Sequence, residues 1–305
     1  FDATLFQVPS GERSKSLQQA NELYTRLLES RADRNSVIIA LGGGVVGDLA
    51  GFVAATFMRG IQFVQVPTTI LSQVDSSVGG KVGVNHAMGK NLIGAFYQPQ
   101  FVLIDPDTLK TLPEREIRAG YAEVIKYGFI QDRDFYDMCA EHLDILFDLS
   151  DPELLVHSLF TSCKIKADVV SQDEKEAGVR ATLNFGHTVG HAIESLTGYA
   201  EFLHGEAIVH GMIAALELSA KAGTLSRKDV EMATLVLEKF NPPKLPAEIC
   251  YDSLIAAMQK DKKRSAAGQL WVLLKNIGQS SLTRDVKEHE VKQAIEYMIS
   301  RGTSV

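Results

Sequence analysis

The first third of the chain alternates short apolar runs with longer stretches in which apolar residues recur every three or four positions. The apolar runs are residues 37–41, 63–66 and 101–105, and the first of them is β-branched at three positions, which favours a buried strand. Strands that alternate with helices in this way indicate a layer of mainly parallel sheet covered by helices. We therefore predict an α/β domain over residues 1–111.

Beyond this domain the pattern becomes helical. Pro113, followed by acidic residues, is typical of a helix start, because proline is tolerated in the first turn and acids interact well with the helix N-terminus. A strand-like run at 270–274 interrupts the helical pattern. We predict a mostly helical second domain over residues 112–305. The clearest of its long helical stretches are residues 154–170, 207–222 and 229–240.

A glycine-rich turn follows the first apolar run. Gly42, Gly44 and Gly47 satisfy the pattern G-x-G-x-x-G, and a helical stretch at 49–58 follows. Glycines in this context let the backbone approach a pyrophosphate at the N-terminus of the helix. The next strand ends in Pro67-Thr68-Thr69, without the acid that usually binds a ribose hydroxyl, so a standard Rossmann dehydrogenase is not predicted. A turn used only for packing is the alternative.

The apolar stretch 37–58 is long enough to span a bilayer, but three consecutive glycines and Asp48 exclude a transmembrane helix. No signal-peptide pattern opens the chain. We therefore predict no association with a membrane. Only 36 residues precede Val37, whereas a nucleotide-binding sheet normally has strands before its glycine turn. We expect the first domain to be incomplete at its N-terminus.

Composition narrows the function further. At 305 residues, with 45% hydrophobic and 23% charged residues, the chain has the size and composition of a two-domain globular protein. A net charge of −7 and the lack of a dense basic run argue against nucleic-acid binding. The three cysteines are dispersed, which fits a reducing compartment and argues against thiolate ligands for a metal. We expect a cytoplasmic protein; a plastid location would require a targeting segment before residue 1.

Histidine spacing provides a second chemical signature. His187 and His191 are four residues apart and share one face if the segment is helical, and His204 follows closely. Glu123 and Lys126 share a face of another predicted helix, and Glu123 would complete a His₂Glu set, a composition used by catalytic zinc sites that keep an open position. Histidines with a purely structural role are the alternative for so short a motif.

Two glycine-rich polar segments, 75–85 and 89–94, present Lys81 and Lys90. Flexible glycine segments with isolated lysines suit the binding of phosphate or carboxylate oxygens. A pair of ordinary surface loops is the alternative.

A series of motifs, in order along the chain, resembles the 3-dehydroquinate synthase family of sugar-phosphate cyclases. The resemblance runs from Ser10 to about Gly278. It implies a dehydroquinate synthase-like fold, in which an N-terminally incomplete, Rossmann-like nucleotide-binding domain precedes a mostly α-helical metal-binding domain. The motifs are residues 42–48, 67–69, 75–81, 90–91, 122–126, 184–191 and 204–206.

The resemblance also implies individual roles. Glu123, His187 and His204 would hold Zn²⁺ or Co²⁺, and Arg59 would reach the site of a neighbouring subunit, since the family is dimeric. The residues implied along NAD are Glu12, Lys15, Gly42, Gly43, Gly44, Val45, Asp48, Thr68, Thr69, Lys81, Lys90, Thr108, Leu109 and Thr111. The residues implied around the substrate are Asp75, Asn91, Lys126, Lys166, Arg180, Asn184, His191 and Lys262.

The implied reaction is a carbon–oxygen lyase step of the shikimate pathway, which converts 3-deoxy-D-arabino-heptulosonate 7-phosphate to 3-dehydroquinate and phosphate. A sister cyclase acting on another sugar phosphate is one alternative, although Asn184 and the Gly190-His191 pair resemble the dehydroquinate branch. A metal-dependent polyol dehydrogenase of the same plan is another, and it has less need for clustered cations such as Lys126 and Arg180. A non-catalytic protein that retains the fold is the third.

Overall fold

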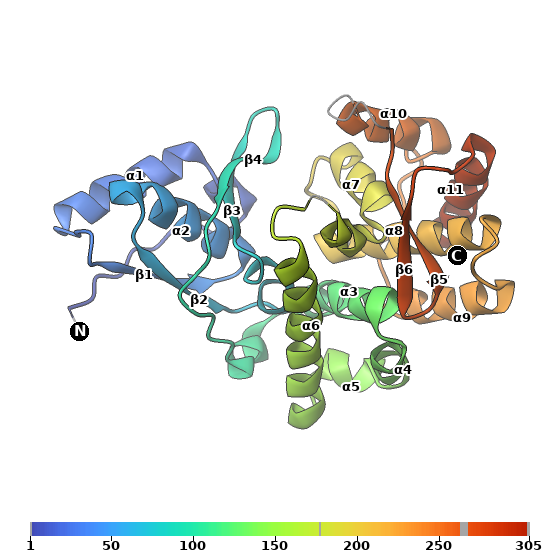
Figure 1. Ribbon diagram of the computed structural model, residues 1–305, viewed down its shortest axis with the longest axis horizontal. Coiled ribbons are helices and arrows are strands. Elements are labelled where there is room, and N and C mark those ends of the chain that lie inside the picture. The colour runs from blue at the N-terminus through green and yellow to red at the C-terminus, as the bar shows by residue number, and fades with distance from the viewer. Residues whose placement is uncertain (1, 177, 263–267, 304–305) are drawn as a thin grey trace. The chain divides into compact units, whose positions relative to one another are not determined.

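The computed structural model describes residues 2–176, 178–262 and 268–303, without the side chains of 260–262 and 303 (Figure 1). The chain divides into two compact units, Phe1–Leu112 and Pro113–Val305. The first is an α/β unit and the second is mostly helical, which confirms the predicted fold class. Within the described ranges, none of the helices combines the length and the apolar character that crossing a bilayer requires.

A parallel strand pair and the helix that joins its strands form the centre of the first unit. Strand β1 (Val37–Gly42) pairs with β2 (Gln62–Pro67), with Val37 opposite Gln62 and Gly42 opposite Pro67. Helix α2 (Gly44–Thr56) connects them and packs against α1 (Leu17–Glu29). Their apolar faces meet in a buried cluster that includes Leu23, Phe52 and Phe63. The predicted strand–turn–helix unit is thus confirmed, with the helix beginning earlier than residue 49.

Strand β1 is less buried than its composition indicates. Ile39 and Leu41 are 66% and 62% exposed, so the prediction of a buried strand is wrong. Side chains alternate across a strand, and α2 covers one face of β1. None of the described residues covers the side chains of Ile39 and Leu41 on the other face.

The third predicted strand, 101–105, is reduced to one isolated bridge between Gln65 and Val102. The Gln65 N–H donates to the Phe101 carbonyl, and the Leu103 N–H donates to the Gln65 carbonyl. Pairing stops there because Asp105 caps a short 3-10 helix, η4 (Pro106–Thr111), and proline has no N–H to donate.

Residues 81–85 of the first glycine-rich segment and all of the second, predicted as flexible segments or surface loops, lie in an antiparallel hairpin of β3 (Lys81–His86) and β4 (Gly89–Phe96). Gly83 and Gly94 stand opposite one another, and a Cβ at Gly94 would lie 2.2 Å from the Val82 carbonyl oxygen. These glycines therefore allow two strands to approach closely. Short turns complete the unit: η1 (Glu12–Ser14), η2 (Phe57–Arg59) and the π-helical η3 (Ser72–Ser76).

The second unit is built around α8 (His204–Lys221), which is buried over most of its length and packs against α3, α7, α9 and α11. A hairpin of β5 (Trp271–Asn276) and β6 (Gln279–Thr283) also contacts it; the sequence indicates the first strand and misses the polar second one. The remaining helices are α3 (Glu114–Gln131), α4 (Arg133–Glu141), α5 (Leu143–Asp148), α6 (Pro152–Gln172), η5 (Val179–Asn184), α7 (His187–Leu196), α9 (Arg227–Glu238), α10 (Tyr251–Lys262) and α11 (Glu288–Thr303).

Candidate functional site

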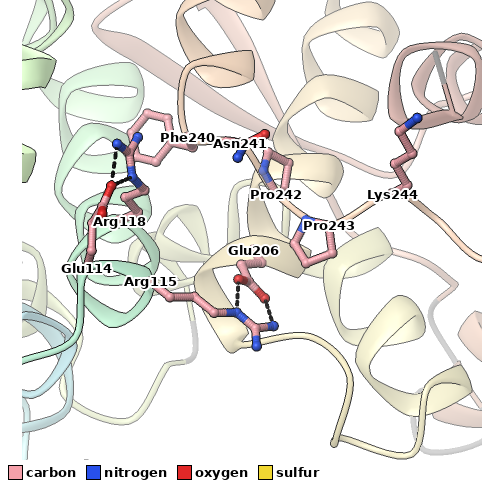
Figure 2. A pocket seen from close by; sticks show the side chains of 9 residues that line it. All are labelled: Glu114, Arg115, Arg118, Glu206, Phe240, Asn241, Pro242, Pro243 and Lys244. Carbon is pink, nitrogen blue, oxygen red and sulfur yellow. Dashed lines mark hydrogen bonds and ion pairs between the residues drawn. The ribbon is translucent and has the colours of Figure 1, made fainter. Parts of the chain in front are cut away.

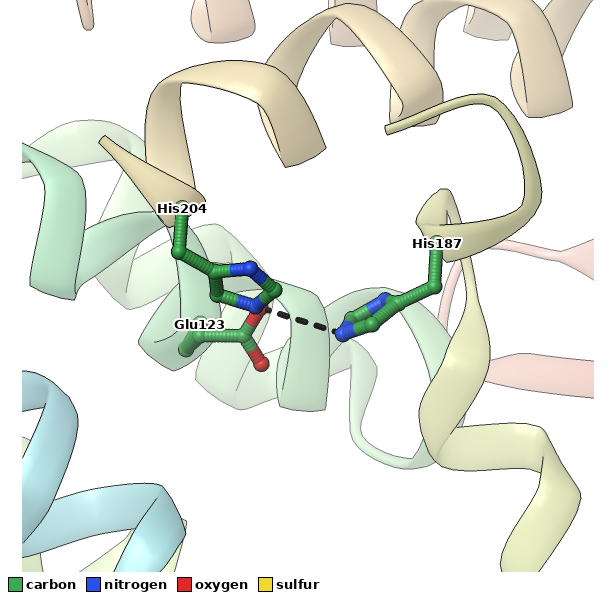
Figure 3. Close-up of side chains that lie close together, drawn as sticks. All are labelled: Glu123, His187 and His204. Carbon is green, nitrogen blue, oxygen red and sulfur yellow. Dashed lines mark ion pairs between the residues drawn. The ribbon is translucent and has the colours of Figure 1, made fainter. Parts of the chain in front are cut away.

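Three helices of the second unit each direct one side chain to a common point. Glu123 lies on α3, His187 begins α7, and His204 begins α8 (Figure 3). The Nε2 atoms of His187 and His204 lie 3.6 Å and 3.5 Å from Oε1 of Glu123. Glu123 is far from the two histidines in sequence, and the fold brings the three residues together.

Glycines on both helices allow α7 and α8 to pack this closely. A Cβ at Gly211 of α8 would lie 1.9 Å from the Gly186 carbonyl oxygen, and one at Gly190 would lie 2.6 Å from Cδ1 of Ile208. Gly186 has a φ of 80°, which glycine adopts without steric cost, and α7 begins directly after it. The motif around His187 therefore combines a candidate ligand with the glycines that let its helix pack closely against α8.

Each of the three side chains has a second partner that orients it. Nδ1 of His187 lies 3.1 Å from the Phe185 carbonyl oxygen, and Nδ1 of His204 lies 3.2 Å from Oε2 of Glu194. Because both Nδ1 atoms face acceptors, we assign a proton to Nδ1 of each ring, which leaves Nε2 as the nitrogen available to a metal ion. Lys126, one turn along α3, forms an ion pair with the other carboxylate oxygen of Glu123.

The donor set fits a divalent metal ion. Oε1 of Glu123 is buried and has no hydrogen-bond partner among the described residues, which is costly for a charged oxygen. A tetrahedral zinc ion with bonds of about 2.1 Å holds its ligands about 3.4 Å apart, close to the separations found here. Two imidazoles and a carboxylate leave at least one position open.

The ionisation of the cluster follows from burial and from its neighbours. Burial opposes the charge on Glu123, but Lys126 and the two histidines outweigh it and hold its pKa well below the usual range. Burial lowers the pKa of His187 to about 3, so this imidazole is neutral at neutral pH. Burial also acts against a charge on His204, yet the nearby carboxylates of Glu123 and Glu194 raise its pKa to about 10. Metal binding through His204 therefore requires release of a proton.

His191 lies beside the cluster. Its ring centroid is 5.2 Å from that of His187 and 5.9 Å from that of His204, and its side chain is exposed. Helix α7 thus carries His187 and His191 on one face, as their spacing predicts. His191 also forms a group with Glu194 and His204 that could hold a metal, with donor atoms within 4.8 Å of one another.

The other predicted substrate residues of this unit lie on α6, η5 and α10. Lys166 and Arg180 are buried, and Arg180 donates to the Glu174 carbonyl. Asn184 donates to Oε1 of Glu176 across 2.8 Å. Helix α6 packs against η5 and α3. Lys262 ends α10, and its side chain lies outside the described residues.

In the first unit, the predicted cofactor residues gather at the turn between β1 and α2. The Thr68 N–H donates to the Gly42 carbonyl across 3.0 Å. A Cβ at Gly43 would lie 3.3 Å from the Thr69 side chain, and one at Gly44 would lie 3.1 Å from Oγ of Ser76. The glycine turn therefore lies next to the end of β2 and next to η3, which contains Asp75. Val45 follows in the first turn of α2.

Asp48 is buried on α2 and forms an ion pair with Lys15. Burial raises the pKa of Asp48, and the Lys15 cation opposes this effect. The segment before α1 is also tied to the hairpin, because Nδ2 of Asn85 donates to Glu12 and the N–H of Asn91 donates to Asn85. The fold thus brings Glu12, Lys15, Asp48 and Asn91 near one another.

The remaining predicted residues of the first unit are spread along its connections. Lys81 and Lys90 lie on β3 and β4. Thr108, Leu109 and Thr111 lie on η4, where Leu109 is fully buried in the core.

Arg59 lies in an exposed turn at η2. Met58 and Arg59 have φ values of 51° and 71°, so two consecutive non-glycine residues adopt the left-handed region. Such strain is found at functional positions more often than elsewhere.

Two features of the site escape the sequence analysis. Glu194 follows His187 and His191 at positions i+7 and i+3, the spacing that would have identified it. Arg115 and Glu206 join the starts of α3 and α8 through a bidentate ion pair, with Nε–Oε1 and Nη2–Oε2 distances of 2.6 Å and 2.8 Å. Figure 2 shows these side chains facing one another at the edge of a cavity of about 420 Å³.

Glu206 also accepts a 2.7 Å hydrogen bond from the Leu203 N–H, and so caps the helix that His204 begins.

Comparison with known proteins agrees with this geometry. A family model described as 3-dehydroquinate synthase N-terminal matches residues 5–119, and one described as 3-dehydroquinate synthase C-terminal matches residues 120–264. The 3-dehydroquinate synthase of Desulforamulus reducens is 52% identical over 292 residues, which cover 95% of this chain and 81% of that protein.

Two solved cyclase structures share the fold. One is 2-epi-5-epi-valiolone synthase from Streptomyces hygroscopicus with NAD⁺ and Zn²⁺ bound, at a TM-score of 0.89 and 26% identity over 96% of this chain and 82% of that one. The other is 2-deoxy-scyllo-inosose synthase in complex with carbaglucose-6-phosphate, NAD⁺ and Co²⁺, at a TM-score of 0.84 and 31% identity over 94% and 80%. With family models covering both units and a relative that is 52% identical, the chain belongs to the 3-dehydroquinate synthase family.

Proposed function

We propose that this chain is the enzyme that its family name describes. It converts 3-deoxy-D-arabino-heptulosonate 7-phosphate to 3-dehydroquinate and phosphate, with NAD and one divalent metal ion, zinc or cobalt. The observation that carries the proposal is the convergence of Glu123, His187 and His204 in a chain whose relatives are 3-dehydroquinate synthases. The NAD⁺, Zn²⁺ and Co²⁺ bound in the two cyclase structures support the cofactors.

The two parts of the chain have separate tasks in this proposal. Residues 1–111 hold NAD, with its pyrophosphate at the N-terminus of α2, where Gly43 and Gly44 leave room for the backbone to approach. Residues 112–305 hold the metal and the substrate. The side chains around NAD include Lys15, Asp48, Thr68, Thr69, Lys81 and Lys90. Those around the substrate include Lys126, Lys166, Arg180, Asn184, His191 and Lys262.

Bound NAD would supply reversible hydride transfer at the substrate alcohol, and a metal ion held by Glu123, His187 and His204 would supply polarisation of substrate oxygens. The protein groups bind, orient and exchange protons. Lys126 neutralises one oxygen of Glu123 and keeps that carboxylate ionised. Lys166 and Arg180 attract the anionic ends of the substrate and fix its orientation. The exposed imidazole of His191 exchanges a proton with a substrate hydroxyl beside the cluster.

The active form in this proposal is a cytoplasmic homodimer. Arg59 is exposed on a strained turn, which supports a role outside its own subunit. Its guanidinium would bind the phosphate of a substrate held by the partner copy.

The decisive experiment measures phosphate release and NADH absorbance together. With the heptulosonate phosphate as substrate, we expect phosphate release without net NADH, because the hydride returns to the product. Accumulation of NADH would identify a polyol dehydrogenase instead. Glucose 6-phosphate, a sugar phosphate without a carboxylate, serves as the control, and faster turnover of it would indicate a sister cyclase. No turnover of either substrate by a metal- and NAD-loaded protein would contradict the proposal.

A further inference from the structure

Glu194 is a buried acid on α7 with no role in the reaction described above. The residue is 5% exposed, and its Oε2 lies 3.2 Å from Nδ1 of His204 on the neighbouring helix. An ionised carboxylate is removed from water only at a large cost unless a donor compensates it. The Nδ1–H of His204 is such a donor, because Oε2 of Glu194 can only accept when it is ionised.

The two histidines of the cluster are oriented by different means. Nδ1 of His187 faces the carbonyl of Phe185, two residues earlier, so the local backbone fixes that ring. His204 is the first residue of α8, and its Nδ1 partner is a side chain from another helix. The orientation of His204 therefore depends on a side chain that a substitution can remove, whereas that of His187 depends on the backbone.

We propose that Glu194 is a positioning residue, which holds His204 in the Nδ1–H tautomer with Nε2 directed at the metal position. The hydrogen bond fixes the plane of the ring, and the negative charge makes Nε2 a stronger donor. This inference rests on the proposed metal site and adds to it the residue that prepares one ligand before the metal arrives.

The position of Glu194 also suggests a different role. Together with His191 and His204, it could bind a second metal ion. In that arrangement Nδ1 of His204 would lose its proton and bind the second ion, while Nε2 binds the first. The 3.2 Å separation is that of a hydrogen bond, which favours the positioning role. Metal stoichiometry separates the two.

The test measures zinc affinity by competition with a chelator and so does not depend on activity. Glu194→Met keeps the length of the side chain and removes the acceptor, and we expect affinity to fall about 10- to 100-fold. Glu194→Gln keeps an acceptor oxygen without the charge and should restore part of the loss. Glu217→Met is the matched control, because Glu217 is an equally buried acid of α8 that pairs with Arg227 at the other end of the helix. It should leave zinc affinity unchanged.

Cobalt provides a second readout, since its visible spectrum reports the ligand geometry. We expect the Glu194→Met spectrum to differ from that of the wild type and the Glu217→Met spectrum to match it. Wild-type zinc affinity in a folded Glu194→Met variant would overturn the proposal, as would two zinc ions per wild-type chain.

If Glu194→Met does not fold, ¹⁵N spectra of histidine-labelled, zinc-loaded wild-type protein decide the question. A proton on Nδ1 of His204 supports the positioning role, and an unprotonated Nδ1 contradicts it. The outcome is independent of catalysis: zinc binding that depends on Glu194, in a protein that releases no phosphate, would support this inference and contradict the proposed reaction.

Discussion

Gly205 of α8 lies directly against Ala119 of α3, and a Cβ at position 205 would stand 1.8 Å from the Ala119 carbonyl oxygen. The obstructing atoms belong to the backbone, so no rotamer change relieves the clash. Ala119 lies one turn before Glu123, and Gly205 directly follows His204. This contact therefore sets the separation of two of the three proposed metal ligands.

Gly205→Ala should both destabilise the protein and weaken metal binding. Overpacking typically costs about 1–3 kcal/mol, and any retreat of α8 moves His204 away from Glu123. Chemical denaturation and zinc titration check the two effects. Lys221→Ala, at the exposed end of the same helix, is the control and should change stability by less than about 0.5 kcal/mol. A Gly205→Ala protein with unaltered zinc affinity would contradict the role of this contact.

Arg115 and Glu206, which form an ion pair, should contribute unequally to the free energy of unfolding. Arg115 is 55% exposed, so its side of the ion pair contributes about 1 kcal/mol or less. Glu206 is buried and also caps α8 through the Leu203 N–H, an interaction whose loss costs about 0.5–2 kcal/mol by itself. We expect Glu206→Ala to lower the free energy of unfolding more than Arg115→Met. Denaturation in urea measures both, and the reverse order would contradict the capping role.

Replacement of His191 should affect turnover and leave metal content intact. His191 lies near the cluster, but the geometric set of Glu123, His187 and His204 is complete without it. We expect His191→Ala to bind one metal ion per chain while its kcat falls by about 100-fold or more, the contribution typical of proton transfer. His187→Ala is the comparison and should lose the metal. Equal metal loss in both variants would make His191 a ligand.

Removal of the metal should lower thermal stability. Without a cation, Oε1 of Glu123 remains buried and unpartnered among the described residues. Zinc at 100 times its Kd should stabilise the native state by about 2.7 kcal/mol, because it binds the folded chain alone. Calorimetry with and without a chelator measures the shift in Tm. The same chelator should leave the Tm of His187→Ala unchanged.

His210 should make the protein sensitive to mild acid. Its Nε2 donates to the Pro243 carbonyl across 3.0 Å, and burial lowers its pKa from the ordinary value of 6.5. Below pH 6.5 the unfolded chain binds a proton that the folded chain does not, so this contribution to stability is complete above pH 6.5 and declines as the pH falls. The slope is at most about 1.4 kcal/mol per pH unit. His210→Gln, which can still donate to Pro243, should lose less stability than the wild type between pH 7.5 and 5.5 in urea denaturation.

The sequence predicts the elements whose signal is local. Strand β1, the glycine turn and α2 follow from a short apolar run, a tight turn and a helical period, and the HxxxH spacing correctly places two histidines on one face of α7. The β3–β4 hairpin is missed because Gly83 and Gly94 are typical of loops, and the need for them appears only when the strands are paired. The exposure of Ile39 is missed for a similar reason, since a β-branched apolar run does not reveal which faces of a strand are covered.

In the candidate site, too, local features are predicted from the sequence and non-local contacts are not. Ligand types and helical spacing can be read along the chain, whereas the partnership of Glu194 with His204 depends on how α7 lies against α8. Nothing in the spacing of Arg115 and Glu206, which are far apart in sequence, indicates that they meet.

The backbone contact between Gly186 and Gly211 has a consequence for which ion the protein accepts. Calcium forms bonds of about 2.3–2.6 Å, against about 2.0–2.2 Å for zinc, so a calcium ion would have to spread the ligands apart. At this contact the main chain of α7 lies against that of α8, and a Cβ at Gly211 would stand 1.9 Å from the Gly186 carbonyl oxygen. Calcium binding would therefore have to separate two helices that pack main chain to main chain, and we expect the site to favour zinc over calcium.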